Sequence, residues 1–274
     1  MVTIKKGVMP PIKYFGGKNG MKKVIYEYFP PNDSYDTYIE PFGGSYGVGI
    51  GMENLPKVEI YNDLNKNVYS LYKVINDNDL FEKFREKCEK TYYSEDLRNE
   101  YRLKLQEDLD IVDRAFMYFY VNRTSRNGNG GLSVNRSVRR GMSKSTSDFL
   151  SAVERLPELH DRLSRVVVLN RDAIGLIEKY NDENCFLYCD PPYDWSTRSN
   201  VRYETDMNEE QQDEFLKAVI DSKAKILISG YDCERYKILE ENGFTKEKFS
   251  VSVMSGDNNT PKEKEETLWF NYGR

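Results

Sequence analysis

The fold is decided by a stretch of nine residues, Cys185-Phe186-Leu187-Tyr188-Cys189-Asp190-Pro191-Pro192-Tyr193. Its first five residues are apolar or aromatic, and a short run of this kind that ends at a turn predicts a buried strand. The two prolines fix the backbone and remove two N–H donors, so the turn presents the Asp190 carboxylate and main-chain carbonyls as a rigid set of acceptors. Such a set suits an amino group. The alternative is an ordinary proline-rich turn with an exposed aspartate.

Strands and helices alternate on both sides of this stretch. Such alternation predicts a mostly parallel sheet with helices on both faces. The end of the chain differs. Two predicted strands there are separated by a polar stretch, which indicates an antiparallel hairpin at one edge of the sheet. We therefore expect an α/β, Rossmann-like fold with a C-terminal antiparallel hairpin. The expected strands are residues 35–39, 58–61, 166–169, 185–189, 224–228, 249–254 and 267–272, and the expected helices include one from Ala173 and one over 209–220.

The middle of the chain has a different character. Residues 64–75 carry apolar side chains at helical spacing, and residues 80–121 look helical throughout. Residues 122–147 are rich in Gly, Ser, Asn and Arg and have no clear periodicity. We therefore predict a catalytic domain over 1–63 and 166–274, into which a helical recognition lobe, residues 64–165, is inserted.

Positive charge is concentrated in that lobe. The chain has a net charge of -5, yet the segment between Asp113 and Asp148 holds no acidic residue and carries +7, which leaves -12 for the other residues. A solvated, mobile loop is one interpretation. A basic segment in an acidic body more strongly indicates a polyanion such as a nucleic acid as partner.

Some classes of site are disfavoured by residue counts. The four cysteines form no CxxC pair and His160 is the single histidine, so we expect no metal site built from Cys and His. Nucleophilic catalysis of the Ser-His or Cys-His kind would have to use His160, for which a partly buried structural role is the better prediction. The sequence shows no membrane-spanning run and no secretory signal, so we expect a cytoplasmic protein.

A second unusual turn follows another predicted strand. It is Glu40-Pro41-Phe42-Gly43-Gly44-Ser45, and its glycines allow the backbone to approach a cofactor closely. Ligands of open parallel sheets bind at the carboxyl ends of the strands, where this turn lies. Asp63 follows the next strand and could accept hydrogen bonds from ribose hydroxyls, or could cap the helix that starts near Leu64. A ligand-free turn and a dinucleotide-binding fold are the alternatives.

These motifs together resemble a known family. Residues 13–18 (KYFGGK), 38–45 (YIEPFGGS), 61–65 (YNDLN) and 190–193 (DPPY) are similar, in this order, to the motifs of Dam-type, D12 class DNA adenine-N6 methyltransferases. The segments 121–123 (VNR), 130–132 (GGL), 226–229 (ILIS) and 266–272 are also similar to parts of that family. The resemblance spans nearly the whole chain.

The resemblance implies S-adenosylmethionine as cofactor and a site for it. Asp190, Pro191, Pro192 and Tyr193 would form the catalytic loop, in which Asp190 and the Pro191 carbonyl grip the target amine. Asp172 would hold the adenine amine of the cofactor, although it could equally cap the next helix. The residues that the resemblance assigns to the cofactor are Tyr14, Lys18, Pro41, Phe42, Gly43, Gly44, Ser45, Asp63, Asp172 and Asp190.

The implied substrate is an adenine flipped out of double-stranded DNA and stacked on an aromatic side chain such as Tyr193. An arginine such as Arg126, Arg136 or Arg139 could reach guanine edges. A cognate restriction enzyme is a further partner that the resemblance suggests. Tyr14 stands where relatives often carry tryptophan, and residues 124–144 depart enough that no target sequence can be carried over. The expected DNA-binding residues are Arg123, Arg126, Asn129, Arg136, Arg139, Arg140 and Lys144.

Three alternatives remain open. Methylation of cytosine N4 would need the same geometry, although Asp rather than Ser at the start of the loop favours adenine by resemblance. A catalytically inactive DNA-binding protein on the same scaffold is the second. A nucleotide-dependent oxidoreductase is the third, although the loop 190–193 has no evident role in hydride transfer.

Overall fold

The structure, a computed structural model, describes residues 8–14, 16–128, 130–194, 206–254 and 261–273. Contacts within the chain group it into two compact units. The helical unit contains Met1–Lys22, Gly44–Glu53 and Asn65–Asn170. The sheet unit contains Lys23–Gly43, Asn54–Leu64 and Arg171–Arg274.

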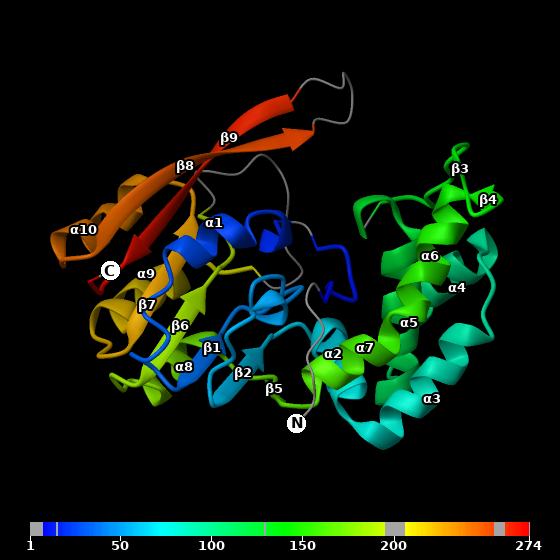
Figure 1. Ribbon diagram of the computed structural model, residues 1–274, viewed down its shortest axis with the longest axis horizontal. Coiled ribbons are helices and arrows are strands. Elements are labelled where there is room, and N and C mark those ends of the chain that lie inside the picture. The colour runs from blue at the N-terminus through cyan, green and yellow to red at the C-terminus, as the bar shows by residue number, and fades with distance from the viewer. Residues whose placement is uncertain (1–7, 15, 129, 195–205, 255–260, 274) are drawn as a thin grey trace. The chain divides into compact units, whose positions relative to one another are not determined.

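The sheet has seven strands in the order β5-β2-β1-β6-β7-β9-β8 (Figure 1). The pairs β1–β2, β1–β6 and β6–β7 are parallel, whereas β7–β9 and β8–β9 are antiparallel. The predicted α/β fold with a C-terminal antiparallel hairpin is therefore confirmed. The strands are β1 (Thr37–Glu40), β2 (Val58–Asn62), β5 (Val166–Leu169), β6 (Cys185–Cys189), β7 (Lys225–Gly230), β8 (Thr245–Met254) and β9 (Pro261–Phe270).

The hairpin strands begin earlier than their side chains predict. β8 starts at Thr245 rather than residue 249, and β9 starts at Pro261 rather than residue 267. The first residues of β8 are charged and show no apolar alternation, so they gave no strand signal. Lys246 and Lys248 instead form ion pairs with neighbouring acids such as Asp232. Charged side chains are typical of the outer strand of a sheet, where they discourage pairing with another chain.

Aromatic side chains fill one side of the central strands. Phe186 of β6 makes edge contacts with Phe29 and Tyr35, at centroid distances of 4.7 and 5.1 Å. Full burial of such a side chain contributes about 1.5–3 kcal/mol to folding. The helices of this unit are α1 (Lys22–Glu27), α8 (Ala173–Lys179), α9 (Glu209–Ile220) and α10 (Lys237–Glu241), with a short 3-10 turn, η5 (Glu234–Tyr236).

The helical unit has α5 at its centre, packed against α2, α3, α4 and α6. Phe119 and Tyr120 on α5 both contact Phe149 of α6, at centroid distances of 6.5 and 5.4 Å. The helices are α2 (Lys66–Asn76), α3 (Asn78–Glu89), α4 (Glu95–Lys104), α5 (Ile111–Thr124), α6 (Lys144–Glu154) and α7 (Leu156–Leu163). The short elements are η1 (Lys18–Gly20), η2 (Gly49–Gly51), η3 (Arg126–Gly128), β3 (Val138–Arg139) and β4 (Met142–Ser143).

The prediction of one continuous helical stretch over 80–121 was wrong. Three helices cover it, because capping side chains start new helices within the stretch. Ser94 accepts a hydrogen bond from the Leu97 amide, and Asp110 accepts from the amides of Val112 and Asp113. Such caps satisfy amide groups that have no partner within the helix, and they stabilise a helix start by about 1 kcal/mol.

The two units differ from the predicted domain limits at several segments, and residues 166–170, which contain β5, are among those that group with the helices. Met1–Lys22 and Gly44–Glu53 group with the helices, whereas the sequence placed them with the sheet. The physical reason is a set of polar contacts between the segment before Tyr14 and the end of α5, where Asn122 and Arg123 bind main-chain groups of residues 10–13.

Candidate active site

Polar groups follow the ends of neighbouring parallel strands in the sheet unit. Pro41 follows β1, Asp63 follows β2 and Asp190 follows β6, while Ser229 lies near the end of β7. Because these four strands are adjacent and parallel, their carboxyl ends lie at the same edge of the sheet. This edge is where ligands bind in open α/β folds.

Two hydroxyl groups orient the Asp190 carboxylate. Ser229 Oγ donates to Asp190 Oδ1 over 2.9 Å, and the hydroxyls of Tyr188 and Ser229 are 2.9 Å apart. A serine has one hydroxyl hydrogen, so Ser229 donates to Asp190 and accepts from Tyr188. Burial raises the pKa of Tyr188 well above its ordinary value, and the Asp190 charge raises it further. Tyr188 therefore stays protonated and remains a donor.

The rest of the loop is held from other elements of the sheet unit. Gln212 of α9 donates through Nε2 to the Pro192 carbonyl over 2.7 Å. The Tyr193 hydroxyl donates to Glu266 Oε2 of β9 over 3.0 Å, and its ring meets that of Tyr231 edge-on at 4.6 Å. The buried location of Tyr193 and its polar partner fix its ring plane. The loop is thus rigid before any substrate binds.

Both glycines of the turn stand where a side chain would clash with a neighbouring aromatic ring. Gly43 belongs to the sheet unit and Gly44 to the helical unit. A Cβ at Gly43 would lie 2.2 Å from the Tyr61 ring, inside the sheet unit. Gly44 has a φ of +48°, and a Cβ there would lie 3.0 Å from the ring of Tyr14, inside the helical unit. The first glycine lets β1 and β2 approach, and the second leaves the Tyr14 ring close against bare backbone. No other residue fits both conditions at Gly44.

Other predicted cofactor residues take definite places. Phe42 meets Phe215 of α9 edge-on at 5.5 Å. Lys18 is buried and donates through Nζ to the Gly16 carbonyl over 3.1 Å. The main-chain carbonyl of Ser45 accepts a short hydrogen bond from the Tyr72 hydroxyl. These contacts fix the turn and the N-terminal motif within their own units.

The two aspartates with alternative roles are now distinguished. Asp63 does not cap α2, because Asn65 occupies the cap position and accepts from the amides of Asn67 and Val68. The alternative of a capping role for Asp63 therefore falls to Asn65, and Asp63 is a buried carboxylate at a strand end. Asp172 is a cap, since its Oδ2 accepts from the Gly175 amide over 2.8 Å.

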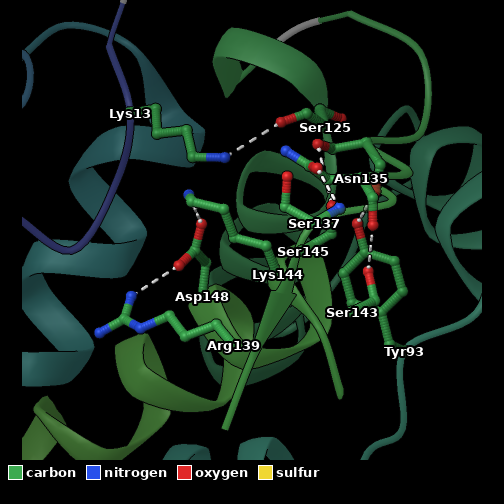
Figure 2. A network of polar contacts seen from close by, with 11 residues as sticks. Lys13, Tyr93, Ser125, Asn135, Ser137, Arg139, Ser143, Lys144, Ser145 and Asp148 are labelled. Atoms are coloured by element: carbon green, nitrogen blue, oxygen red, sulfur yellow. Dashed lines mark hydrogen bonds and ion pairs between the residues drawn. The ribbon is translucent and has the colours of Figure 1, made fainter. Parts of the chain in front are cut away.

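Acids just beyond the basic segment pair with several of its cations. Asp148 of α6 binds Arg139 and Lys144, at 2.9 and 2.6 Å, and Figure 2 shows the carboxylate between the two cations. Arg140 forms a two-pronged ion pair with Glu154. Two acids that follow the segment in sequence thus compensate part of the +7 charge.

Two arginines counted in that charge hold the fold. Arg114 is buried and donates to main-chain carbonyls of Leu105 and Glu107. Arg123 donates to the carbonyls of Pro10 and Pro11, and burial, together with Arg155, lowers its pKa to about 10. Sequence reasoning assigned Arg123 to DNA, and this second task for its guanidinium was not visible in the sequence.

Arg126 and Arg136 are the exposed cations of the segment whose side chains form no ion pair or hydrogen bond with any described residue. Asn129, also predicted to bind DNA, lies outside the described residues. The prediction that His160 is structural agrees with its contacts: it stacks on Phe81 at 4.3 Å and binds the Ile75 carbonyl through Nδ1. Within the described part of the chain, no cluster of His, Cys, Asp or Glu is arranged to hold a metal ion.

Sequence reasoning missed the residues that hold the two functional loops. Ser229 and Gln212 support the catalytic loop, and Arg98 supports the loop after α5 by donating to Ser125 Oγ over 3.0 Å and to the Gly130 carbonyl. The strand motif ILIS ends at Ser229, so that serine carried a weak signal. Gln212 and Arg98 lie in ordinary polar helices and carried none.

Comparison with known proteins identifies the family of this chain. The chain matches the family model of D12 class N6 adenine-specific DNA methyltransferases over residues 14–253. It therefore belongs to that family and is an enzyme that methylates DNA.

Two relatives are named as Type II methyltransferases. The chain is 27% identical over 196 residues to Type II methyltransferase M.CviBI of Paramecium bursaria Chlorella virus NC1A. This match covers 68% of this chain and 69% of that protein. It is 28% identical over 203 residues to Type II methyltransferase M.MjaIII of Methanocaldococcus jannaschii, with the same coverage. Within the described residues, no helix has both the length and the hydropathy that crossing a bilayer requires.

Proposed function

We propose that this enzyme transfers a methyl group from S-adenosylmethionine to the N6 amine of an adenine that is flipped out of double-stranded DNA. The observation that carries the proposal is the Asp190 carboxylate at the end of β6, oriented by Ser229 in a loop stiffened by two prolines. A carboxylate in that position can accept a hydrogen bond from an amine.

The residues assigned to the cofactor fit it within each unit. In the helical unit, the Tyr14 ring lies against the backbone of Gly44, so the aromatic ring and the glycine turn would face the cofactor together. In the sheet unit, Asp63 is buried at a strand end. Its carboxylate could accept hydrogen bonds from both hydroxyls of the cofactor ribose. When bound, S-adenosylmethionine supplies a methyl group on a positively charged sulfur. The proposed cofactor residues are Tyr14, Lys18, Pro41, Phe42, Gly43, Gly44, Ser45, Asp63, Asp172 and Asp190.

The loop would activate the amine by holding its hydrogens. An exocyclic amine is a poor nucleophile because its lone pair is delocalised into the ring. Acceptors at Asp190 and at the Pro191 carbonyl would draw the nitrogen toward tetrahedral geometry and aim its lone pair at the methyl group. The Pro192 carbonyl already accepts from Gln212, which supports Pro191 as the second acceptor. Orientation of this kind can supply most of the rate, without a covalent enzyme intermediate.

The target base would stack on Tyr193. Its hydroxyl on Glu266 and its edge contact with Tyr231 hold the ring plane, so a flipped base would meet a preformed surface. A flipped base must come from DNA that the protein grips by its backbone and grooves. The residues proposed for this are Arg123, Arg126, Asn129, Arg136, Arg139, Arg140 and Lys144, with Arg126 and Arg136 the first candidates because no described residue neutralises them.

The alternatives make different predictions. Cytosine-N4 methylation would use the same loop and differ only in the nucleoside produced. An inactive DNA-binding protein would retain DNA affinity without transfer. A role beside a restriction enzyme would rest on a partner that this chain alone does not identify.

The test is transfer of label from S-adenosylmethionine into unmethylated DNA, with the Asp190→Ala variant in parallel. Label that enters DNA with the wild type and not with the variant supports the proposal. Binding of both ligands without transfer would instead support the inactive scaffold.

A further inference from the structure

Asn122 forms an unusual pair of hydrogen bonds with the N-terminal segment. Its Oδ1 accepts from the Lys13 amide and its Nδ2 donates to the Lys13 carbonyl, each over 2.8 Å. The Asn122 side chain thus satisfies both main-chain groups of Lys13, as a neighbouring strand would do in a sheet. Asn122 is itself buried in the last turn of α5, so this contact fixes Lys13 to the helix end.

The loop that follows α5 rests on the same residue. A Cβ at Gly128 would lie 2.4 Å from the Lys13 carbonyl oxygen and 2.9 Å from Asn122 Nδ2, and Gly128 has a φ of +89°. The Lys13 ammonium donates to the Ser125 carbonyl over 3.3 Å, a contact that Figure 2 shows. The loop and the N-terminal segment are therefore packed backbone against backbone, and neither can shift without the other.

The loop is also closed on itself. Arg98 binds Ser125 and Gly130, while the Ser125–Leu132 bridge and the hydrogen bond from the Arg126 amide to Gly131 join its two arms. The described residues of this loop, 125–128 and 130–132, are therefore tied to one another, and Arg126 is among them. A displacement at Lys13 would be transmitted to the whole loop and to that arginine.

We propose that Asn122 is a positioning residue that couples cofactor binding to DNA binding. This inference rests on the proposed function: the residue after Lys13 is Tyr14, assigned to the cofactor, and the loop carries Arg126, assigned to DNA. Both ligands would bias the position of the same joint. The first to bind would shift the joint toward the position that the second requires, which makes the two affinities mutually favourable.

The test measures four dissociation constants. S-adenosylhomocysteine, which cannot donate a methyl group, is titrated into the protein with and without a DNA duplex that the wild type methylates, and the duplex is titrated with and without the cofactor product. In the wild type, we expect each ligand to tighten the other by about 5- to 10-fold. In Asn122→Ala, we expect that factor to fall to near 1 while each ligand still binds alone.

Asn76→Ala is a matched control. Asn76 also uses its side-chain amide to hold distant main chain, since it donates to the carbonyls of Leu163 and Val166 in the same unit. Loss of stability alone would be similar in the two variants, but only Asn122→Ala should lose the coupling. If Asn122→Ala does not fold, Gly128→Ala, which pushes the loop away from Lys13, tests the same joint.

The outcomes separate the two proposals. A wild type that binds both ligands with no mutual effect, or an Asn122→Ala protein that keeps the full coupling factor, overturns the coupling and leaves the proposed function intact. A wild type that binds neither ligand overturns both. Loss of coupling in Asn76→Ala to the same degree would also overturn the specific role of Asn122.

Discussion

The catalytic loop and the basic hairpin are held by contacts of opposite character. The loop is fixed by buried neutral donors, Ser229 and Gln212. The hairpin of β3 and β4 is fixed by surface ion pairs, in which the side chains of Arg139 and Arg140 are 54% and 45% exposed. Each part therefore has the kind of support that its task requires.

The two kinds of contact differ in how easily another group can replace the partner. An exposed ion pair contributes only about 0–1 kcal/mol, so a DNA phosphate can replace Asp148 or Glu154 as the partner of an arginine at small cost. A buried hydrogen bond to a carboxylate is lost at a cost of about 1.5–3 kcal/mol. The proposed recognition surface would thus adapt to DNA, whereas the loop would keep one geometry. The predictions below test this contrast.

The largest effect is expected at Asp190. Asp190→Ala removes an acceptor for the amine, and we expect kcat to fall by about 10²–10³-fold, as with other preorganised hydrogen-bonding groups. Asp190→Asn keeps the shape and one acceptor oxygen and should retain part of the activity. Single-turnover methyl transfer at saturating ligands checks this, and equal, near-wild-type rates in both variants would contradict the role.

Ser229→Ala should have the next largest effect. It removes the donor that orients Asp190, so we expect kcat to fall about 10-fold with little change in the KM for DNA. Tyr188→Phe is the matched variant: Ser229 can still donate to Asp190, so the loss should be smaller. An equal loss in both, or an effect on KM alone, would show that the hydroxyl pair does not act through Asp190.

A smaller effect is expected for DNA affinity at the arginines. Arg126→Ala should weaken binding and reduce the slope of log K against log salt by about 1, because one phosphate contact is lost. Arg140→Ala should weaken binding less, since Arg140 must first leave Glu154. Glu154→Gln removes that competition and should strengthen binding. Salt titrations of all three measure this, and a stronger effect for Arg140 than for Arg126 would reverse the ranking.

The smallest effect is expected for stability. Burial tends to raise the pKa of Asp148, but Lys144 and Arg139 outweigh it, so the pKa lies below the ordinary value of 3.8. A depressed pKa stabilises the fold above the unfolded-state value, and this contribution is lost as pH falls through the folded-state value. Asp148→Asn should therefore be less stable than wild type at pH 7, by less than ~1 kcal/mol. Thermal unfolding should converge for the two proteins as the pH falls through the depressed pKa of Asp148, below 3.8, and a constant difference at all pH values would count against this pair.

Much of the fold followed from local patterns. The run Cys185–Cys189 is an apolar strand that ends at a two-proline turn, and both features are encoded in consecutive residues. The helix starts at Ser94 and Asp110 were also encoded locally, but the strongly charged surroundings hid them. The charged start of β8 could not be predicted, because its strand state depends on pairing with β9 rather than on its own side chains.

The site was predicted less completely, for a related reason. Asp190 and Asp63 stand in motifs, whereas the partner of Asp190 is a serine 39 residues further along the chain. The acids that pair with Arg139 and Arg140 lie 9 and 14 residues later, outside the basic segment. Counting charge within that segment therefore overestimated what it offers to DNA. Contacts between residues distant in sequence appear only when the sheet and helices are assembled.

The most direct test of the account is the identity of the methylated nucleoside. Unmethylated DNA is incubated with labelled S-adenosylmethionine and either the wild type or Asp190→Ala, then digested to nucleosides and separated. The account predicts N6-methyladenine from the wild type and none from the variant. N4-methylcytosine, or N6-methyladenine formed equally well by the variant, would contradict it.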